Sequence, residues 1–175
     1  MKTFCQFITE ASSSLETLNS KLKSVNGKTV PRGHAQHQVE NDPDLHKIIK
    51  HGKTFTEMHP NTKKCKRTEH GECHWNAAAE YKAGNADRIA IGYAHHPETG
   101  WHQHSWGVKD GKVVEPSPHD KGNTHWHGKV LSKKESDAFA AHVGKKENYP
   151  GAGNVRTHKG GSVEDMVQRH NKEMK

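Results

Sequence analysis

The chain has 175 residues, which suits one modest domain with appendages and leaves little room for two independent cores. Only 30% of the residues are hydrophobic, so the apolar side chains must be concentrated in one region if a core is to outweigh chain entropy. The formal net charge of +7 favours nonspecific attraction to a polyanion, but the basic residues lie singly or in pairs among acidic ones, unlike the dense stripe of a groove-reading module. No apolar stretch is long enough for a membrane span or a secretory signal, and three cysteines are too few for a disulfide scaffold. We therefore expect a soluble protein of cytosolic origin with reduced thiols and no membrane partner.

The segment before the expected core is polar and contains one predicted amphipathic helix. Leu15, Leu18 and Leu22 recur at helical spacing, which is typical of a helix with one docking face. The following run, VPRGHAQHQVENDPD, carries turn formers and few apolar residues, and this predicts an exposed connector. We assign residues 11–52 to a polar arm.

The middle of the chain predicts a helix followed by a small antiparallel sheet. An alanine-rich segment begins at Cys73 and ends at a Gly-Asn pair, after which RIAIGYA alternates in the manner of a strand. The runs WHQHSWGV and KVVEP flank Asp110-Gly111, and this dipeptide is a strong signal for a hairpin turn. These elements predict an α+β core over residues 53–145.

Two capping boxes predict helices after the sheet. Ser132 with Glu135, and Ser162 with Asp165, have the spacing at which a serine hydroxyl and an acidic side chain satisfy each other's backbone N–H groups. The residues between the two helices read as a flexible linker. We assign residues 146–175 to this linker and a C-terminal helix.

The hairpin predicts a contact between a histidine and an acid. If the turn has two residues, counting outward makes His104 and Glu115 diagonal neighbours on one face, roughly 7–8 Å apart at the backbone. A hydrogen bond across that distance would fix the histidine tautomer and stabilise its protonated form. A three-residue loop would turn Glu115 to the opposite face, and Asn123 would then be a poor but possible orienter.

Cys73 is the candidate nucleophile for this histidine. At a helix N-terminus its thiolate is favoured by the helix dipole and by a nearby imidazolium, and its own backbone N–H could help to hold an oxyanion. One alternative is an inert, buried thiol. Another is a zinc site with Cys65, His70 and His74, although these spacings match no familiar zinc finger.

The other histidines occur in pairs and clusters that we interpret as solvated loops. Binding of nickel, copper or zinc by these loops is an open alternative. We expect no metal and no cofactor at the candidate active site. The clustered histidines are His95, His96, His102, His119, His125 and His127.

The order cysteine, histidine, acid resembles that of papain-like thiol enzymes, including the NlpC/P60 and transglutaminase-like branches. Over about residues 70–118, the segments CHWNAAAEY, IAIGYA, GWHQHSWGV and GKVVEPS are similar to small phage and bacterial proteins of papain-like type. The resemblance implies a papain-like core, in which a nucleophile helix packs on a small antiparallel sheet. It implies three catalytic residues and three supporting ones. These are Cys73 as nucleophile, His104 as base and Glu115 as orienter, with Asn76, Gln103 and Trp106 in support.

The N-terminal run MKTFCQFITEA resembles the capsid-targeting leader of internal head proteins from large contractile-tailed bacteriophages. In that family the prohead protease cuts after a short hydrophobic-x-Glu site. This site corresponds here to Ile8-Thr9-Glu10 and implies cleavage before Ala11, which makes residues 1–10 a cleavable leader. The resemblance implies a virion protein that lies in the capsid interior beside packaged DNA and enters the host cytoplasm with the genome.

These residues and resemblances predict a thiol hydrolase or acyltransferase that acts on a host protein. Attack of the thiolate on an acyl carbon would give a thioester, which water or an amine resolves. Peptidase, deamidase and acyltransferase activities all remain open. The alternative from another class is a noncatalytic papain-like scaffold that inhibits a host defence protein or coats packaged DNA.

Overall fold

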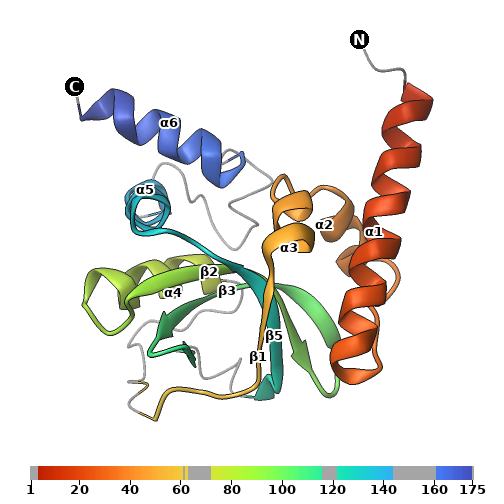
Figure 1. Cartoon of the computed structure of the whole chain (residues 1–175), viewed down its shortest axis with the longest axis horizontal. Coiled ribbons are helices and arrows are strands. Elements are labelled where there is room, and N and C mark those ends of the chain that lie inside the picture. Colours follow the sequence, from red (N-terminus) through yellow and green to blue (C-terminus); the bar gives the residue numbers. More distant parts are fainter. Residues whose placement is uncertain (1–3, 61, 63–71, 116–121, 144–160, 175) are drawn as a thin grey trace.

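The computed structural model describes residues 4–60, 62, 72–115, 122–143 and 161–174. Within these residues the chain has the expected α+β composition, with an antiparallel five-stranded sheet curled into a half-barrel and six helices (Figure 1). The strands, in the spatial order β1-β5-β2-β3-β4, are β1 (Lys53–Phe55), β5 (His125–Val130), β2 (Arg88–His96), β3 (Gly100–Lys109) and β4 (Lys112–Val114). The helices are α1 (Phe4–Asn26), α2 (His34–Glu40), α3 (Leu45–His51), α4 (Cys73–Lys82), α5 (Lys133–Val143) and α6 (Val163–Glu173).

The sheet curls far enough for its two edges to be bridged. The segment that follows β1 runs beside β4, where Met58 and Val113 form a parallel bridge. The His59 N–H donates to the Val113 carbonyl at 2.7 Å, and the Val113 N–H donates to the Glu57 carbonyl at 3.0 Å. The bridge encloses an inner face, which the apolar side chains of β1, β2, β3, β4 and β5 line.

A pair of glycines lets Trp106 fill this inner face. Gly92 of β2 and Gly128 of β5 are direct cross-strand partners. A Cβ atom on Gly128 would lie 2.6 Å from Trp106 Cη2, and one on Gly92 would overlap the His127 carbonyl oxygen. Only glycine therefore allows this close approach of strands and indole.

Helices cover the outer face of the sheet at both ends. The apolar sides of α4, α5 and α6 pack with Ile89 and Ile91, whereas those of α1, α2 and α3 pack with Tyr93 and Trp101 (Figure 1). Strand alternation places the three residues of β2 on one side of the sheet. The packed core therefore includes helices that precede and follow the predicted core segment, residues 53–145, in the sequence.

The β3–β4 hairpin has the two-residue turn that the sequence predicts. Lys109 pairs with Lys112, and the backbone φ angles are 50° at Asp110 and 73° at Gly111. Positive φ at both central residues is the signature of a type I′ turn. Because the register is confirmed, the three-residue alternative is excluded, and Glu115 continues β4 on the predicted face.

The prediction of an exposed connector before the core is wrong. α2 lies within this run, and Val39, Asp42 and Asp44 are buried. The turn formers here lie at the ends of short helices. The carboxylates of Asp42 and Asp44 accept hydrogen bonds from the sheet and from α6, and these bonds attach the run to the core. The predicted arm is therefore a packed layer of helices.

The predicted leader and the predicted amphipathic helix are parts of one helix, α1. Leu18 and Leu22 are fully buried against the sheet and α3, which confirms the docking face. The expected cleavage position between Glu10 and Ala11 lies inside α1.

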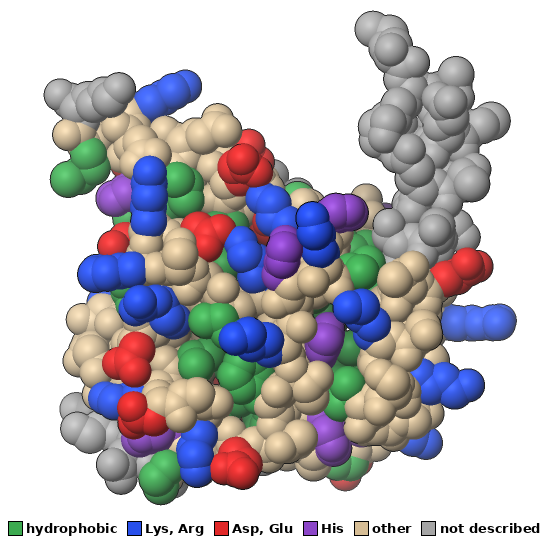
Figure 2. Space-filling model, viewed as in Figure 1, with side chains coloured by type: hydrophobic (Ala, Val, Ile, Leu, Met, Phe, Trp, Pro, Cys, Tyr) green, Lys and Arg blue, Asp and Glu red, His purple; other side chains and the backbone are tan. Residues whose placement is uncertain are grey.

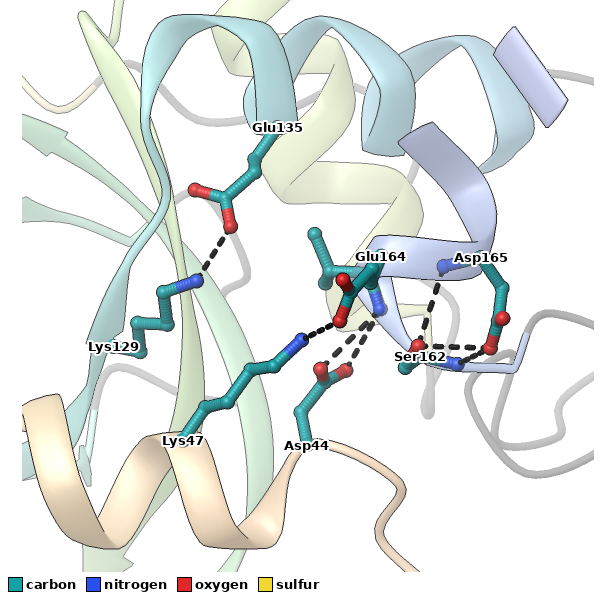
Figure 3. A network of polar contacts seen from close by, with 8 residues as sticks. Asp44, Lys47, Lys129, Glu135, Ser162, Glu164 and Asp165 are labelled. Carbon is teal, nitrogen blue, oxygen red and sulfur yellow. Dashed lines mark hydrogen bonds and ion pairs between the residues drawn. The ribbon is translucent and has the colours of Figure 1, made fainter. Parts of the chain in front are cut away.

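Both predicted capping boxes are present. At the start of α5, the Ser132 N–H donates to Glu135 Oε2 at 2.8 Å, and the Glu135 N–H donates to Ser132 Oγ at 3.3 Å. Ser162 and Asp165 make the same exchange at the start of α6 (Figure 3). Residues 144–160 lie outside the described part of the chain, and this range includes most of the predicted linker between these helices.

A buried carboxylate joins α6 to the segment before α3. Asp44 is fully buried and accepts the Val163 N–H at 3.0 Å (Figure 3). Beside it, Lys47 Nζ lies 2.8 Å from Glu164 Oε2. Because Val163 and Met166 are also buried, the C-terminal helix is part of the folded core.

Basic side chains are spread over the face shown in Figure 2 and lie among acidic, histidine and uncharged ones. This distribution agrees with the alternation of charge along the sequence.

Candidate active site

The start of α4 places Cys73 beside β3. The N-cap residue Glu72 makes no side-chain hydrogen bond to the helix, and the first N–H groups of a helix carry a partial positive charge that favours an anion. β4 pairs only with Gly107–Lys109, so it does not cover the edge of β3 at His104. The start of α4 lies at this edge, and Cys73 is half-buried there.

The hydrogen bond predicted between His104 and Glu115 is confirmed. His104 Nε2 lies 2.5 Å from Glu115 Oε2, and each side chain is 1% exposed. A carboxylate is an acceptor only, so the proton of neutral His104 is held on Nε2. The other ring nitrogen, Nδ1, is then the one available for an interaction with Cys73, which helps to raise the pKa of His104.

Aromatic contacts restrict rotation of the His104 ring. Trp106 stacks on it with ring centroids 6.1 Å apart and an angle of 15° between planes. His102 contacts it edge-on at 5.5 Å. The indole is itself fixed over Gly128, so the packing of the inner face helps to orient the imidazole.

Glu115 and Cys73 favour the protonated form of His104. Burial opposes a charge on the imidazole, but the hydrogen-bonded Glu115 carboxylate and the neighbouring Cys73 outweigh it. The pKa of His104 therefore lies well above its usual value. This environment favours the imidazolium form of the ring.

The thiol of Cys73, in contrast, favours its deprotonated form. Burial opposes ionisation of Cys73, but the neighbouring rings of His74 and His104 outweigh it, so the pKa of the thiol lies well below its usual value. Thiolates, not thiols, are the nucleophilic form of cysteine. The arrangement can therefore hold a thiolate–imidazolium pair at neutral pH.

His74 is a site residue that sequence reasoning considered only as a zinc ligand. It is buried, its Nδ1 lies 2.6 Å from Ser105 Oγ, and its ring meets Phe139 edge-on at 5.9 Å. The His74 ring, like that of His104, helps to lower the pKa of the Cys73 thiol. One signal in the sequence points to a polar contact on the other face of β3. Strand alternation places Ser105 and His104 on opposite faces of this strand.

The three predicted supporting residues have different surroundings. Trp106 contacts the His104 ring, as described above. Asn76 lies one helical turn after Cys73 and is buried, and neither of its amide atoms has a hydrogen-bond partner among the described residues. Gln103 points to the outer face, where its Nε2 donates to Asp42 Oδ2 at 2.8 Å, so the structure does not bring it together with His104.

The structure alters the interpretation of the clustered histidines. The prediction of solvated loops is wrong for His95, His96, His102, His125 and His127, because these residues lie in β2, β3 and β5. His95 and His127 are also buried. His119 lies outside the described residues, as do Cys65 and His70 of the zinc alternative. The described part of the chain contains no group of three or more His, Cys, Asp or Glu side chains suited to a metal ion.

Comparison with known protein families, curated proteins and solved structures finds no match to this chain. Among the described helices, none combines the length and the apolar character that crossing a bilayer requires.

Proposed function

We propose that this chain is a papain-like thiol hydrolase or acyltransferase in which Cys73 is the nucleophile, His104 the base and Glu115 the orienter. The observation that carries the proposal is the buried hydrogen bond between Glu115 and His104, the imidazole whose charge favours the thiolate form of Cys73. A thiol at a helix start, with a histidine and an acid from an adjacent antiparallel hairpin, has the order of elements that the resemblance implies.

The same three side chains can carry both halves of an acyl transfer. The Cys73 thiolate attacks the acyl carbon and forms a C–S bond, while the His104 imidazolium gives its proton to the leaving group as the bond to that group breaks. In the second half, water or an amine attacks the thioester, neutral His104 takes its proton, and the C–S bond breaks to return the thiolate. Glu115 keeps the ring oriented and stabilises its charged form throughout.

The proposal is tested by trapping the thioester. The full chain is incubated with p-nitrophenyl acetate, and intact and peptide mass spectrometry locate the acetyl group. We expect acetyl on Cys73 that hydroxylamine removes, and little or none with His104→Ala.

Cys5 and Cys65 in the same sample are internal controls for ordinary thiol reactivity, and Cys73→Ser is the control for the site. If Cys73 acquires no acetyl group, or acquires it at the same rate without His104, the acyl chemistry is refuted. That result would favour the noncatalytic scaffold.

We propose further that the protein is an internal head protein of a bacteriophage, packaged in the capsid and injected with DNA to act on a host protein. The leader-like N-terminal run and the formal charge of +7 support this setting. Co-expression with a prohead protease is expected to give a new N-terminus at Ala11, and Glu10→Ala is expected to prevent it. An unchanged N-terminus in the presence of active protease would contradict the setting.

A further inference from the structure

Packing alone holds the indole that stacks on His104. Trp106 is fully buried, and its Nε1–H has no hydrogen-bond partner among the described residues. A hydrogen bond would fix the direction of the indole, but without one its position depends on the side chains and backbone that touch it. The residues that pack on Trp106 therefore also decide where the stacked imidazole lies.

Two strands outside the hairpin supply this packing. Gly128 of β5 has no side chain, and this leaves room for Trp106 Cη2. Phe55 of β1 meets the indole edge-on, with ring centroids 6.0 Å apart and 79° between planes, which is a favoured geometry for aromatic pairs. Two strands separate β1 from β3 in the sheet, so it is the curl of the half-barrel that brings Phe55 to Trp106.

The indole restrains the imidazole in a way that the hydrogen bond to Glu115 does not. That bond fixes one ring atom, His104 Nε2, and a ring held at one atom can still pivot about it. The plane of the indole lies 15° from that of the imidazole, with ring centroids 6.1 Å apart, and this restricts the plane of the His104 ring. The hydrogen bond and the stack together set the direction of His104 Nδ1.

We propose that Phe55 is a positioning residue of the candidate active site, which holds Trp106 against His104 and thereby fixes the direction of Nδ1. The inference rests on the proposed role of His104 as the base. It extends the site to an edge strand that lies outside the segment with the papain-like resemblance, residues 70–118. A misplacement of about 1 Å at a reacting group can cost about a hundredfold in rate, so a residue that acts only through an indole can still affect the chemistry.

The first readout is the His104 ring itself, measured by NMR in the full chain with isotopically labelled histidine. The Hε1 resonance of His104 is assigned by its loss in His104→Gln, and the ring current of the stacked indole shifts it. We expect Phe55→Ala to move this resonance toward its position in unfolded protein. The midpoint of its pH titration is also expected to fall, because a ring that pivots makes a weaker hydrogen bond with Glu115. Phe55→Tyr keeps the aromatic ring and is expected to retain the wild-type values.

The second readout is the pH dependence of Cys73 alkylation by iodoacetamide, with each cysteine quantified by peptide mass spectrometry. For Phe55→Ala we expect the midpoint of the labelling curve to rise. Labelling at about pH 6 is expected to fall about threefold, which is the effect of half a pKa unit. Met58→Ala is the matched control, because Met58 is also partly buried against the inner-face cluster. It is expected to lower stability and to leave both readouts unchanged.

Phe55→Leu, which removes the ring and keeps apolar bulk, carries the test if Phe55→Ala does not fold. The inference is overturned if the folded variant keeps the wild-type value of either readout, or if Met58→Ala changes both readouts to the same extent. If the wild type forms no acetyl thioester but Phe55→Ala shifts both readouts, only the acyl chemistry is refuted and the positioning role is supported. The two proposals therefore fail separately.

Discussion

Carboxylates are buried on both sides of the sheet, and their partners differ. On the inner side Glu115 binds an imidazole that also contacts a thiol. On the outer side Asp42 accepts from the Tyr93 hydroxyl and the Gln103 amide, each at 2.8 Å. A carboxylate that binds neutral, fixed donors joins layers of structure, whereas one that binds a titratable base also controls where a proton is held. The comparison separates a structural site from the candidate chemical one.

Glu115→Gln gives the largest expected effect, because it removes the charge that stabilises the His104 imidazolium. We expect the alkylation rate of Cys73 at about pH 6 to fall at least tenfold, because one pKa unit is worth a factor of ten in thiolate. The raised pKa of folded His104 also contributes stability. That contribution is present in full below about pH 6.5, the ordinary histidine pKa, and is lost as the pH rises through the raised pKa.

Urea unfolding of wild type and Glu115→Gln at several pH values checks this sign. The difference in free energy of unfolding is expected to shrink as the pH is raised above neutrality. A difference that grows with pH would contradict the assignment of the charge to His104.

Asp42→Ala tests the structural side of the comparison. It leaves two buried donors, on Tyr93 and Gln103, without this acceptor, so we expect a loss of about 1–3 kcal/mol in the free energy of unfolding. The alkylation midpoint of Cys73 is expected to match wild type in folded protein. A shifted midpoint would show that Gln103 influences the thiol across the sheet. Asp42→Asn, which keeps one acceptor oxygen, is the matched control.

The smallest expected effects concern the attachment of α6. Ser162→Ala removes a capping hydroxyl and is expected to cost about 1 kcal/mol in the free energy of unfolding. Lys47→Ala removes an ion pair whose acid is largely exposed, with an expected cost of about 0–1 kcal/mol. Chemical denaturation of both variants checks the order, and a larger loss for Lys47→Ala would contradict it.

Local rules in the sequence were enough to predict the elements that carry the candidate site. An Asp-Gly turn allows few backbone geometries, so it fixed the hairpin register and with it the contact of His104 with Glu115. The serine and acid pairs at two helix starts satisfy backbone groups only three residues away, and both boxes are present.

Features that depend on contacts between distant segments were missed. The run around Asp42 and Asp44 is rich in turn formers, and nothing local shows that these carboxylates meet β2, β3 and α6. The partnership of His74 with Ser105 requires knowing on which side of β3 the helix lies. The sequence predicts a loop at buried His127 because glycine and polar neighbours obscure the short strand β5.

The way α1 is held has a consequence for truncation at its amino end. Its anchoring side chains, Leu18 and Leu22, lie in the second half of the helix, and the amino end extends beyond the sheet in Figure 1. Removing residues 1–10 would shorten α1 and leave Leu18 and Leu22 in place. Cleavage before Ala11 would therefore keep the contacts that Leu18 and Leu22 make with the sheet and α3.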